Sequence, residues 1–288
     1  MPTPSPAVLA DIAHACAIEA GRYISSVFRT DVDVETKADA HDPVTRHDRE
    51  TEALISAYLA RHTPGARILG EEGGTRSLAG SGCEEVSWIV DPIDGTANFA
   101  AGIAYLATSI AAEVSGRVVA ACVHQPITTE CYWADDHTGW RTTPHGHVRA
   151  LRRPGPTREI DALATGYFPH RDPDTTRRHA LADSLARLAD AYASLRSPGA
   201  CALDLAHVAA GFAGVATATF VQPWDVAAGF HLVRVSGGRV HTYDRGTGRP
   251  AHLSPAFVAS AAGLDAATAR EVFDEAGDTW LGPVPASA

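Results

Sequence analysis

The sequence lacks a hydrophobic run long enough to cross a membrane. Its most apolar stretch, residues 100–114, is short, contains Gly102 and already includes Glu113, whereas a membrane-spanning helix needs roughly 20 apolar residues. The first residues show neither the basic segment nor the apolar segment of a secretory signal. These absences predict a protein of the cytoplasm with no membrane partner.

Cysteine and positive charge are also scarce. The five cysteines are an odd number, scattered and without a CxxC pair, which argues against a disulfide framework and a zinc site. Lys and Arg number 24 against 34 Asp and Glu, a formal net charge of −10, so a nucleic acid polymer is not an expected partner. Acidic residues, by contrast, are abundant. The positions of these carboxylates must show whether some are gathered to hold cations.

The composition, with 45% hydrophobic residues in 288, is typical of a globular protein. Hydrophobic spacing predicts helices and strands that mix without strict β-α-β alternation, so we expect a layered α+β fold. The Arg- and Pro-rich segment 152–156 divides the chain into an N-terminal lobe, 1–150, and a C-terminal lobe, 151–288, of one structural unit. The predicted helices are 5–28, 48–62, 175–191, 199–211 and 224–236. The predicted strands are 86–90, 104–114, 117–123, 130–134, 160–164 and 215–218, and Ser115 and Gly116 predict a tight turn between the second and third of them.

The most informative segment is 88–99, WIVDPIDGTANF. An apolar strand is expected to end at Asp91, because the proline that follows has no backbone N–H. Asp94 then lies on what we expect to be an exposed turn, which Gly95 permits. Two carboxylates on such a turn, with the carbonyl of Ile93 between them, can converge on a hard cation such as Mg²⁺. The alternative is a pair of ordinary turn or helix-capping aspartates.

Three further segments place carboxylates at the ends of predicted elements. In Gly-Glu-Glu-Gly-Gly, residues 70–74, the glycines indicate that the backbone passes close to another group. Asp225 begins a predicted helix and is followed by small residues, which indicate tight packing. Asp48 also lies at a predicted helix start, where Thr45 is placed to cap it. For each segment taken alone, solvated charge or a helix cap is the favoured explanation.

Taken together, in this order and spacing, these segments resemble the inositol monophosphatase family of metal-dependent phosphatases. The resemblance covers about residues 7–255. It rests on DPVTRHD at 42–48 with the preceding Lys37, GEE at 70–72, WIVDPIDGT at 88–96 and WDVAAG at 224–229, with weaker similarity at 121–134 and 196–200.

This resemblance implies a layered αβαβα sandwich of the inositol monophosphatase and fructose-bisphosphatase type. It also implies a homodimer that hydrolyses a small phosphorylated metabolite with roughly two or three Mg²⁺ ions per active site. The implied ligands of the first ion are Glu71, Asp91 and the Ile93 carbonyl, and those of the second are Asp91, Asp94 and Asp225. Glu71 would hold a third ion through bridging waters.

The same resemblance implies the roles of the residues around the metal ions. Thr96 would orient the attacking water with Asp48 behind it, so that Glu71, Thr96 and Asp48 form the catalytic set. Backbone amides of Gly95 and Thr96 would contact the phosphate. Gly199, Ala200 and Asp225 would also contact the substrate.

Three positions depart from the family pattern in the expected substrate pocket. Ala218, Gly214 and Ala200 stand where many members carry polar side chains, which predicts a roomier and less polar pocket. A polyol or sugar phosphate such as myo-inositol 1-phosphate is the first expectation for the substrate. The alternatives are histidinol phosphate, a nucleoside monophosphate, a 3′-phosphonucleotide and fructose 1,6-bisphosphate.

Two other readings stay open. The segment 171–179, rich in Arg and His, either grips a second anionic group of the substrate or is a solvated loop. A non-catalytic sensor of phosphorylated metabolites is disfavoured, because such a protein is expected to have lost a metal-binding carboxylate. Glu71, Asp91, Asp94 and Asp225 are all present.

Overall fold

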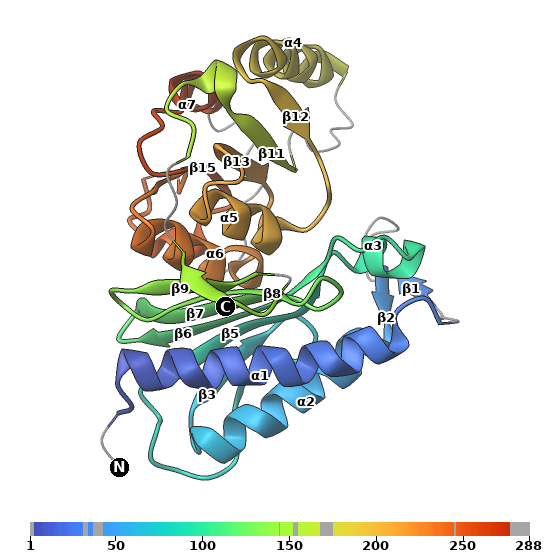
Figure 1. Cartoon of the computed structure of the whole chain (residues 1–288), viewed down its shortest axis with the longest axis vertical. Coiled ribbons are helices and arrows are strands. Elements are labelled where there is room, and N and C mark those ends of the chain that lie inside the picture. Colours follow the sequence, from blue (N-terminus) through green and yellow to red (C-terminus); the bar gives the residue numbers. More distant parts are fainter. Residues whose placement is uncertain are drawn as a thin grey trace.

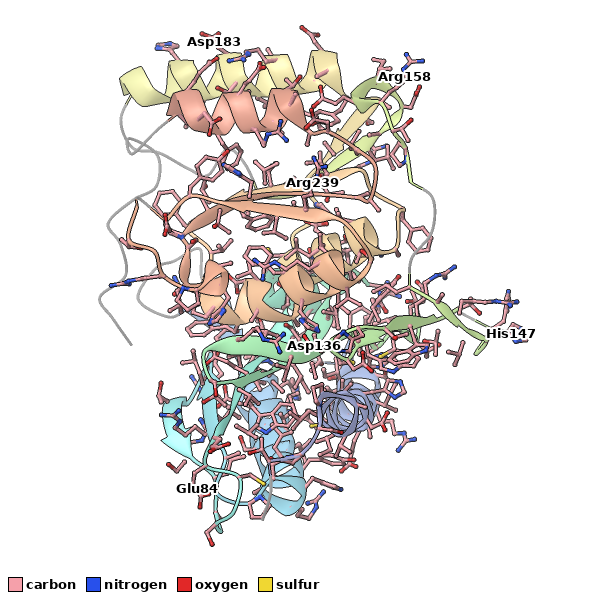
Figure 2. All side chains as sticks on the ribbon, turned by 90° about the vertical axis from the view of Figure 1, so that its left-hand side faces the viewer. Glu84, Asp136, His147, Arg158, Asp183 and Arg239 are labelled. Atoms are coloured by element: carbon pink, nitrogen blue, oxygen red, sulfur yellow. The ribbon has the colours of Figure 1, made fainter. Side chains whose placement is uncertain are left out.

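The computed structural model describes residues 3–30, 34–36, 43–143, 145–151, 155–167, 175–244 and 246–276. Helices and sheets alternate in five layers, as predicted for an αβαβα sandwich (Figure 1). Labelled charged side chains such as Glu84, His147 and Asp183 lie at the periphery, while apolar side chains fill the space between layers (Figure 2). None of the helices in the described ranges is long and apolar enough to cross a membrane.

The first layer consists of α1 (Pro6–Val27) and α2 (Arg46–His62), both within two residues of their predicted bounds. α1 is amphipathic and buries its apolar face against the sheet formed by β7 (Arg117–Gln125) and its neighbours. α2 begins with a capping box in which Thr45 and Asp48 each bind the other's backbone or side chain. A short antiparallel pair, β1 (Val34–Thr36) and β2 (Pro43–Thr45), precedes it.

The second layer is a mixed sheet that contains eight strands within the described residues, in the order β10-β9-β8-β7-β6-β5-β3-β4. β3 runs parallel to β5, and the other neighbours are antiparallel. The strands are β3 (Arg67–Gly70), β4 (Gly74–Ser77), β5 (Val86–Asp94), β6 (Ala107–Val114), β7 (Arg117–Gln125), β8 (Glu130–Ala134), β9 (Gly139–Thr142) and β10 (Val148–Ala150). The predicted turn at Ser115 and Gly116 joins β6 to β7 with positive φ at both residues.

β5 corrects the expectation that the strand ends at Asp91. The pairing with β6 joins Asp91 to Ser109 and resumes at Asp94 with Ala107, with an irregularity between the two pairs. The proline at position 92 lies in this bulge, where no ladder N–H is required of it. Asp91 and Asp94 therefore lie on a bulged strand, and the turn follows them at Gly95, whose φ is 90°.

The fourth layer is a second sheet in the order β12-β11-β13-β15-β14, in which β11 is parallel to β12 and β13. Its strands are β11 (Leu163–Tyr167), β12 (Ser194–Arg196), β13 (Val215–Thr219), β14 (Arg239–Thr242) and β15 (Ala256–Ser260). The predicted strand at 160–164 is displaced, because a 3₁₀ turn, η1 (Glu159–Asp161), occupies its first half. No element was predicted for β14, β15, the turn η2 (Ala251–Leu253) or the last helix.

Helices α5 (Cys201–Ala209) and α6 (Pro223–Val235) lie between the two sheets, and α4 (Thr175–Ala191) and α7 (Ala267–Ala276) cover the outer face of the second (Figure 1). α5 and α6 pack closely, since a Cβ added at Gly229 would lie 2.5 Å from the Cβ of Leu205. This contact confirms the tight packing predicted from the small residues after Asp225. Of the proposed lobe boundary, residues 152–154 lie outside the described ranges.

Candidate active site

Four acidic residues from three segments far apart in sequence supply the carboxylates. Asp91 and Asp94 lie on the bulge of β5 and are 2% and 7% exposed. Glu71 occupies the turn between β3 and β4, and its amide donates to the carbonyl of Val90 at 3.2 Å. Asp225 is the third residue of α6, and its Oδ2 accepts the Gln222 amide at 2.7 Å. The fold thus places Glu71 beside the residue that precedes Asp91.

Asp91 lies within electrostatic reach of the other three carboxylates. Burial raises the pKa of Asp91 well above its usual range, and the charges of Glu71, Asp94 and Asp225 raise it further. Asp91 Oδ1 is buried and has no hydrogen-bond partner in the described part of the chain. Within the same residues, no group of three or more His, Cys, Asp or Glu side chains is arranged to hold a metal ion. The charges of the other three carboxylates nevertheless act on Asp91, and a cation would relieve this repulsion.

Asp94 also connects the first sheet to the central helices. Its Oδ1 accepts the amide of Cys201 at 3.0 Å and its Oδ2 accepts the amide of Ala202 at 2.8 Å. The carboxylate thereby satisfies the first amides of α5, which have no acceptor within the helix. Burial raises the pKa of Asp94 to about 7, although the Ala202 amide acts against this rise. Asp94 therefore does not lie on an exposed turn, because α5 covers it.

Asp48 and Thr96 meet as predicted. The hydroxyl of Thr96 lies 3.0 Å from Asp48 Oδ1 and 3.0 Å from the carbonyl oxygen of Ile93. Asp48 Oδ2 is held by the amide and hydroxyl of Thr45, at 2.8 and 2.6 Å. Burial raises the pKa of Asp48, and the hydrogen bonds from Thr45 oppose that rise. Lys37 and Asp42, which precede this cap, lie outside the described residues.

The predicted phosphate and substrate loops are in contact. A Cβ added at Gly95 would lie 3.1 Å from the carbonyl oxygen of Gly199 and 3.2 Å from the Cβ of Ala200, and the φ of 90° also disfavours a side chain, so glycine suits this approach. Asn98, on α3 (Thr96–Ala101), was not predicted to take part. Its Nδ2 donates to the carbonyls of Tyr105 and Pro198, both at 2.7 Å. Asn98 thus joins the loop after β5 to the loop before α5.

The three positions that depart from the family pattern, Ala200, Ala218 and Gly214, do not lie together in the structure. Ala200 borders Gly95, and Ala218 is buried in β13 between β11 and β15. Gly214 lies at the opposite end of β13, where a Cβ would meet the Cβ of Ala162 at 2.5 Å. The prediction that Gly214 opens the pocket is therefore wrong, since core packing explains this glycine. Residues 171–174 lie outside the described ranges.

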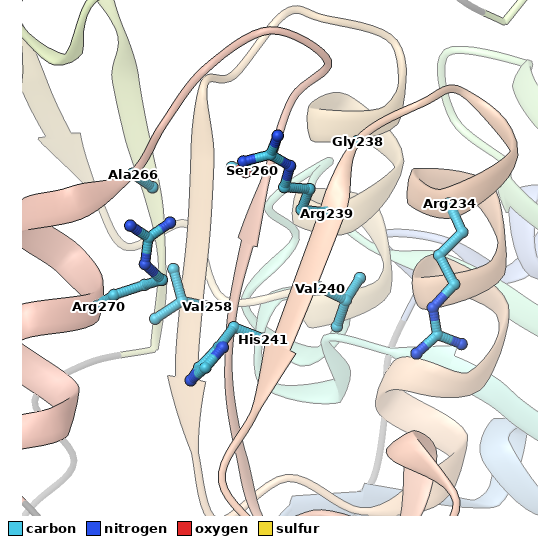
Figure 3. A pocket seen from close by; sticks show the side chains of 9 residues that line it. All are labelled: Arg234, Gly238, Arg239, Val240, His241, Val258, Ser260, Ala266 and Arg270. Atoms are coloured by element: carbon cyan, nitrogen blue, oxygen red, sulfur yellow. The ribbon is translucent and has the colours of Figure 1, made fainter.

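A basic pocket of about 380 Å³ lies elsewhere, at the edge strand β14 (Figure 3). Its basic lining residues are Arg234, Arg239, His241 and Arg270. Arg270 is paired with Asp265 at 2.6 Å, and His241 lies 3.9 Å from Asp274. None of the predicted site residues lines this pocket, so the carboxylate cluster and not this pocket is the candidate active site.

Comparison with known proteins accounts for this arrangement. The sequence model of the inositol monophosphatase family matches residues 5–276. The chain belongs to this family. It is 36% identical over 251 residues to the inositol-1-monophosphatase of Mycobacterium leprae, covering 83% of this chain and 85% of that protein. It is equally similar, 36% over 234 residues, to the Nus factor SuhB of Pseudomonas aeruginosa, covering 81% and 84%.

Solved structures of the family share the fold. An inositol monophosphatase (IMPase) from Thermotoga maritima aligns with a TM-score of 0.75 at 27% identity, over 93% of this chain and 98% of that one. The layered α+β architecture predicted from the motifs is therefore confirmed. The relatives carry two kinds of name, an inositol monophosphatase and a Nus factor. Family membership thus sets the fold and leaves the substrate to be argued from the site.

Proposed function

We propose that this protein is a Mg²⁺-dependent phosphatase that converts a small phosphorylated metabolite to its alcohol and inorganic phosphate. The observation that carries the proposal is Asp91, a buried carboxylate with a partnerless oxygen and three acidic neighbours. A phosphate dianion would be repelled by such a group of charges. A site of this kind is useful to a phosphatase only when cations neutralise it.

The donor set fits Mg²⁺, because it consists of oxygen atoms alone. The residues that would hold it are Glu71, Asp91, Asp94, Asp225 and the carbonyl of Ile93. When bound, Mg²⁺ would lower the pKa of a coordinated water and offset the negative charge that develops in phosphoryl transfer.

The residues of the chain position the reacting groups around that centre. The hydroxyl hydrogen of Thr96 lies between two acceptors, Asp48 Oδ1 and the Ile93 carbonyl. Because Thr96 donates its only hydrogen to one of them, its oxygen lone pairs are free to accept a hydrogen from the attacking water. Backbone amides at the start of α3, from Gly95 and Thr96, have no acceptor within the helix and are suited to the phosphate oxygens.

The leaving group is proposed to lie beside Gly199 and Ala200, which border the phosphate loop. Neither Ala200 nor the buried Ala218 offers a polar side chain to a hydroxyl group. We propose a pocket of broad specificity, because a site without such polar groups cannot strongly select among leaving groups. The family resemblance supports a polyol or sugar phosphate, with myo-inositol 1-phosphate as the first candidate. Nucleotides, histidinol phosphate and fructose 1,6-bisphosphate are the alternatives. The family resemblance further supports a homodimer that acts in the cytoplasm, which light scattering and cell fractionation would test.

Phosphate release from a panel of these compounds tests the proposal. The protein is stripped with EDTA, and each substrate is assayed with and without added Mg²⁺. We expect turnover only with Mg²⁺ and kcat/KM values within about a hundredfold across the panel. Full turnover in the metal-free protein would overturn the metal dependence. A preference for inositol 1-phosphate beyond about a hundredfold would overturn broad specificity, since recognition of one or two hydroxyls accounts for such a ratio.

A further inference from the structure

A buried carboxylate on α2 accepts hydrogen bonds from the loop that carries Glu71. Glu52 is 3% exposed. Its Oε2 accepts the amide of Glu72 at 2.8 Å and its Oε1 accepts the amide of Gly73 at 3.0 Å. The guanidinium of Arg76, on the returning strand β4, donates to the same Oε1 at 2.8 Å. Both sides of the hairpin are therefore attached to one side chain.

The glycines of this loop are explained by the same carboxylate. A Cβ added at Gly70 would lie 2.5 Å from Cδ of Glu52, and one added at Gly73 would lie 2.6 Å from Oε1. Neither glycine has a positive φ, so close approach and not backbone conformation requires them. The group that the Gly-Glu-Glu-Gly-Gly sequence indicated is thus Glu52.

Glu52 belongs to a polar stripe on α2 formed by Asp48, Glu52 and Ser56, which follow one another at intervals of four residues. Side chains at this interval share one face of a helix. Asp48 binds the hydroxyl of Thr96, Glu52 binds the loop of Glu71, and Ser56 accepts from Arg76 at 2.7 Å. One rigid helix therefore sets the distance between the water-orienting threonine and the Glu71 loop.

Resting on the proposed function, we propose that Glu52 is a positioning residue that holds Glu71 at the metal site. Glu71 is located from two directions, by its own amide on the Val90 carbonyl and by Glu52 on the next two amides. Because Val90 precedes Asp91, the hydrogen bond between the Glu71 amide and the Val90 carbonyl sets the spacing of the Glu71 and Asp91 carboxylates. The hydrogen bonds of Glu52 to the next two amides prevent the loop from moving away. Residues that orient metal ligands in this way commonly contribute ten- to a hundredfold to metal affinity.

Glu52→Gln is the test variant, because glutamine keeps the shape but presents an amino group to one of the two amides. Glu159→Gln is the matched control. Glu159 also accepts a hydrogen bond from the backbone amide of Thr268 at 2.9 Å and from the hydroxyl of Tyr192 at 2.9 Å. It lies on the 3₁₀ turn η1, next to the second sheet and not next to the sheet that carries Glu71. Gly73→Ala is the second variant, since its Cβ would lie 2.0 Å from Nη1 of Arg76 and 2.6 Å from Oε1 of Glu52 and so disturb this ion pair without removing any charge.

Calorimetric titration of each EDTA-treated protein with MgCl₂, without substrate, measures the effect. We expect the Kd for Mg²⁺ to rise at least about tenfold in Glu52→Gln and severalfold in Gly73→Ala, and to stay within about twofold in Glu159→Gln. Hydrogen exchange of residues 70–77 in the metal-free protein should be faster in the first two variants only. If Glu52→Gln does not fold, Gly73→Ala decides.

The outcomes separate this inference from the function on which it rests. Wild-type affinity for Mg²⁺ in Glu52→Gln or Gly73→Ala, with wild-type protein that binds the ion, overturns the positioning role alone. An equal loss of affinity in Glu159→Gln also overturns it, because the effect would then be one of general stability. A wild-type protein that takes up no Mg²⁺ overturns the metal-dependent function and this inference together.

Discussion

Replacing Asp94 by asparagine is expected to stabilise the metal-free protein at pH 8 while abolishing its activity. Burial raises the pKa of Asp94 from 3.8 to about 7, so the folded state holds this proton more tightly than the unfolded chain does. The resulting stabilisation is complete below pH 3.8 and is lost as the pH rises through 7. The full loss is about 4 kcal/mol, of which about 3 kcal/mol falls between about pH 5 and 8.

Asparagine resembles the protonated carboxylic acid in shape and charge. It keeps one oxygen to accept from one of the two amides, those of Cys201 and Ala202, and its amino group faces the other, a cost that is the same at every pH. The variant therefore escapes the loss that ionisation imposes on the wild type. Histidine titration has the opposite sign. Burial lowers the pKa of His207 to about 4, so its contribution to stability grows as the pH rises toward 6.5. Comparing the two proteins at each pH removes this contribution, because both contain His207.

Urea unfolding in EDTA, followed by tryptophan fluorescence at about pH 5, 6.5 and 8, measures the difference. We expect the free energy of unfolding of Asp94→Asn relative to wild type to increase by about 3 kcal/mol over this range. Excess Mg²⁺ should narrow the difference at pH 8, since a ligand at about 100 times its Kd stabilises the wild type by about 2.7 kcal/mol. A difference that is the same at all three pH values would refute the reasoning, because Asp94 would then not be held protonated.

Further predictions concern the other carboxylates and the loop before α5. Asp225→Asn should lower kcat by at least about a hundredfold, as removal of a transition-state electrostatic group does, and a near-normal kcat would reduce Asp225 to a helix cap. Glu71→Gln should weaken Mg²⁺ activation more than Glu72→Gln does, and the opposite order in a Mg²⁺ titration would exchange their roles. Asn98→Ala removes one hydrogen bond between the lobes, to Pro198, and one within the N-terminal lobe, to Tyr105, so we expect KM to rise more than kcat falls. A change in kcat alone would contradict this.

The sequence alone was sufficient for the features that depend on neighbours in the chain. Hydrophobic spacing located α1 and α2, and the capping residues Thr45 and Asp48 marked a helix start. Turn chemistry placed Ser115 and Gly116. The motif around Asp91 identified the family. Its side chains lie a few residues apart on a bulge, so local backbone geometry alone brings them together.

Only the tertiary structure decided what those local features contact. Asp94 accepts amides from residues more than 100 positions away, and no periodicity encodes which helix will cover a strand end. Gly214 and Gly70 look alike in sequence, yet one makes room for a core alanine and the other for the carboxylate of Glu52. Long-range packing assigns the partner, since a glycine shows that space is needed without showing what fills it.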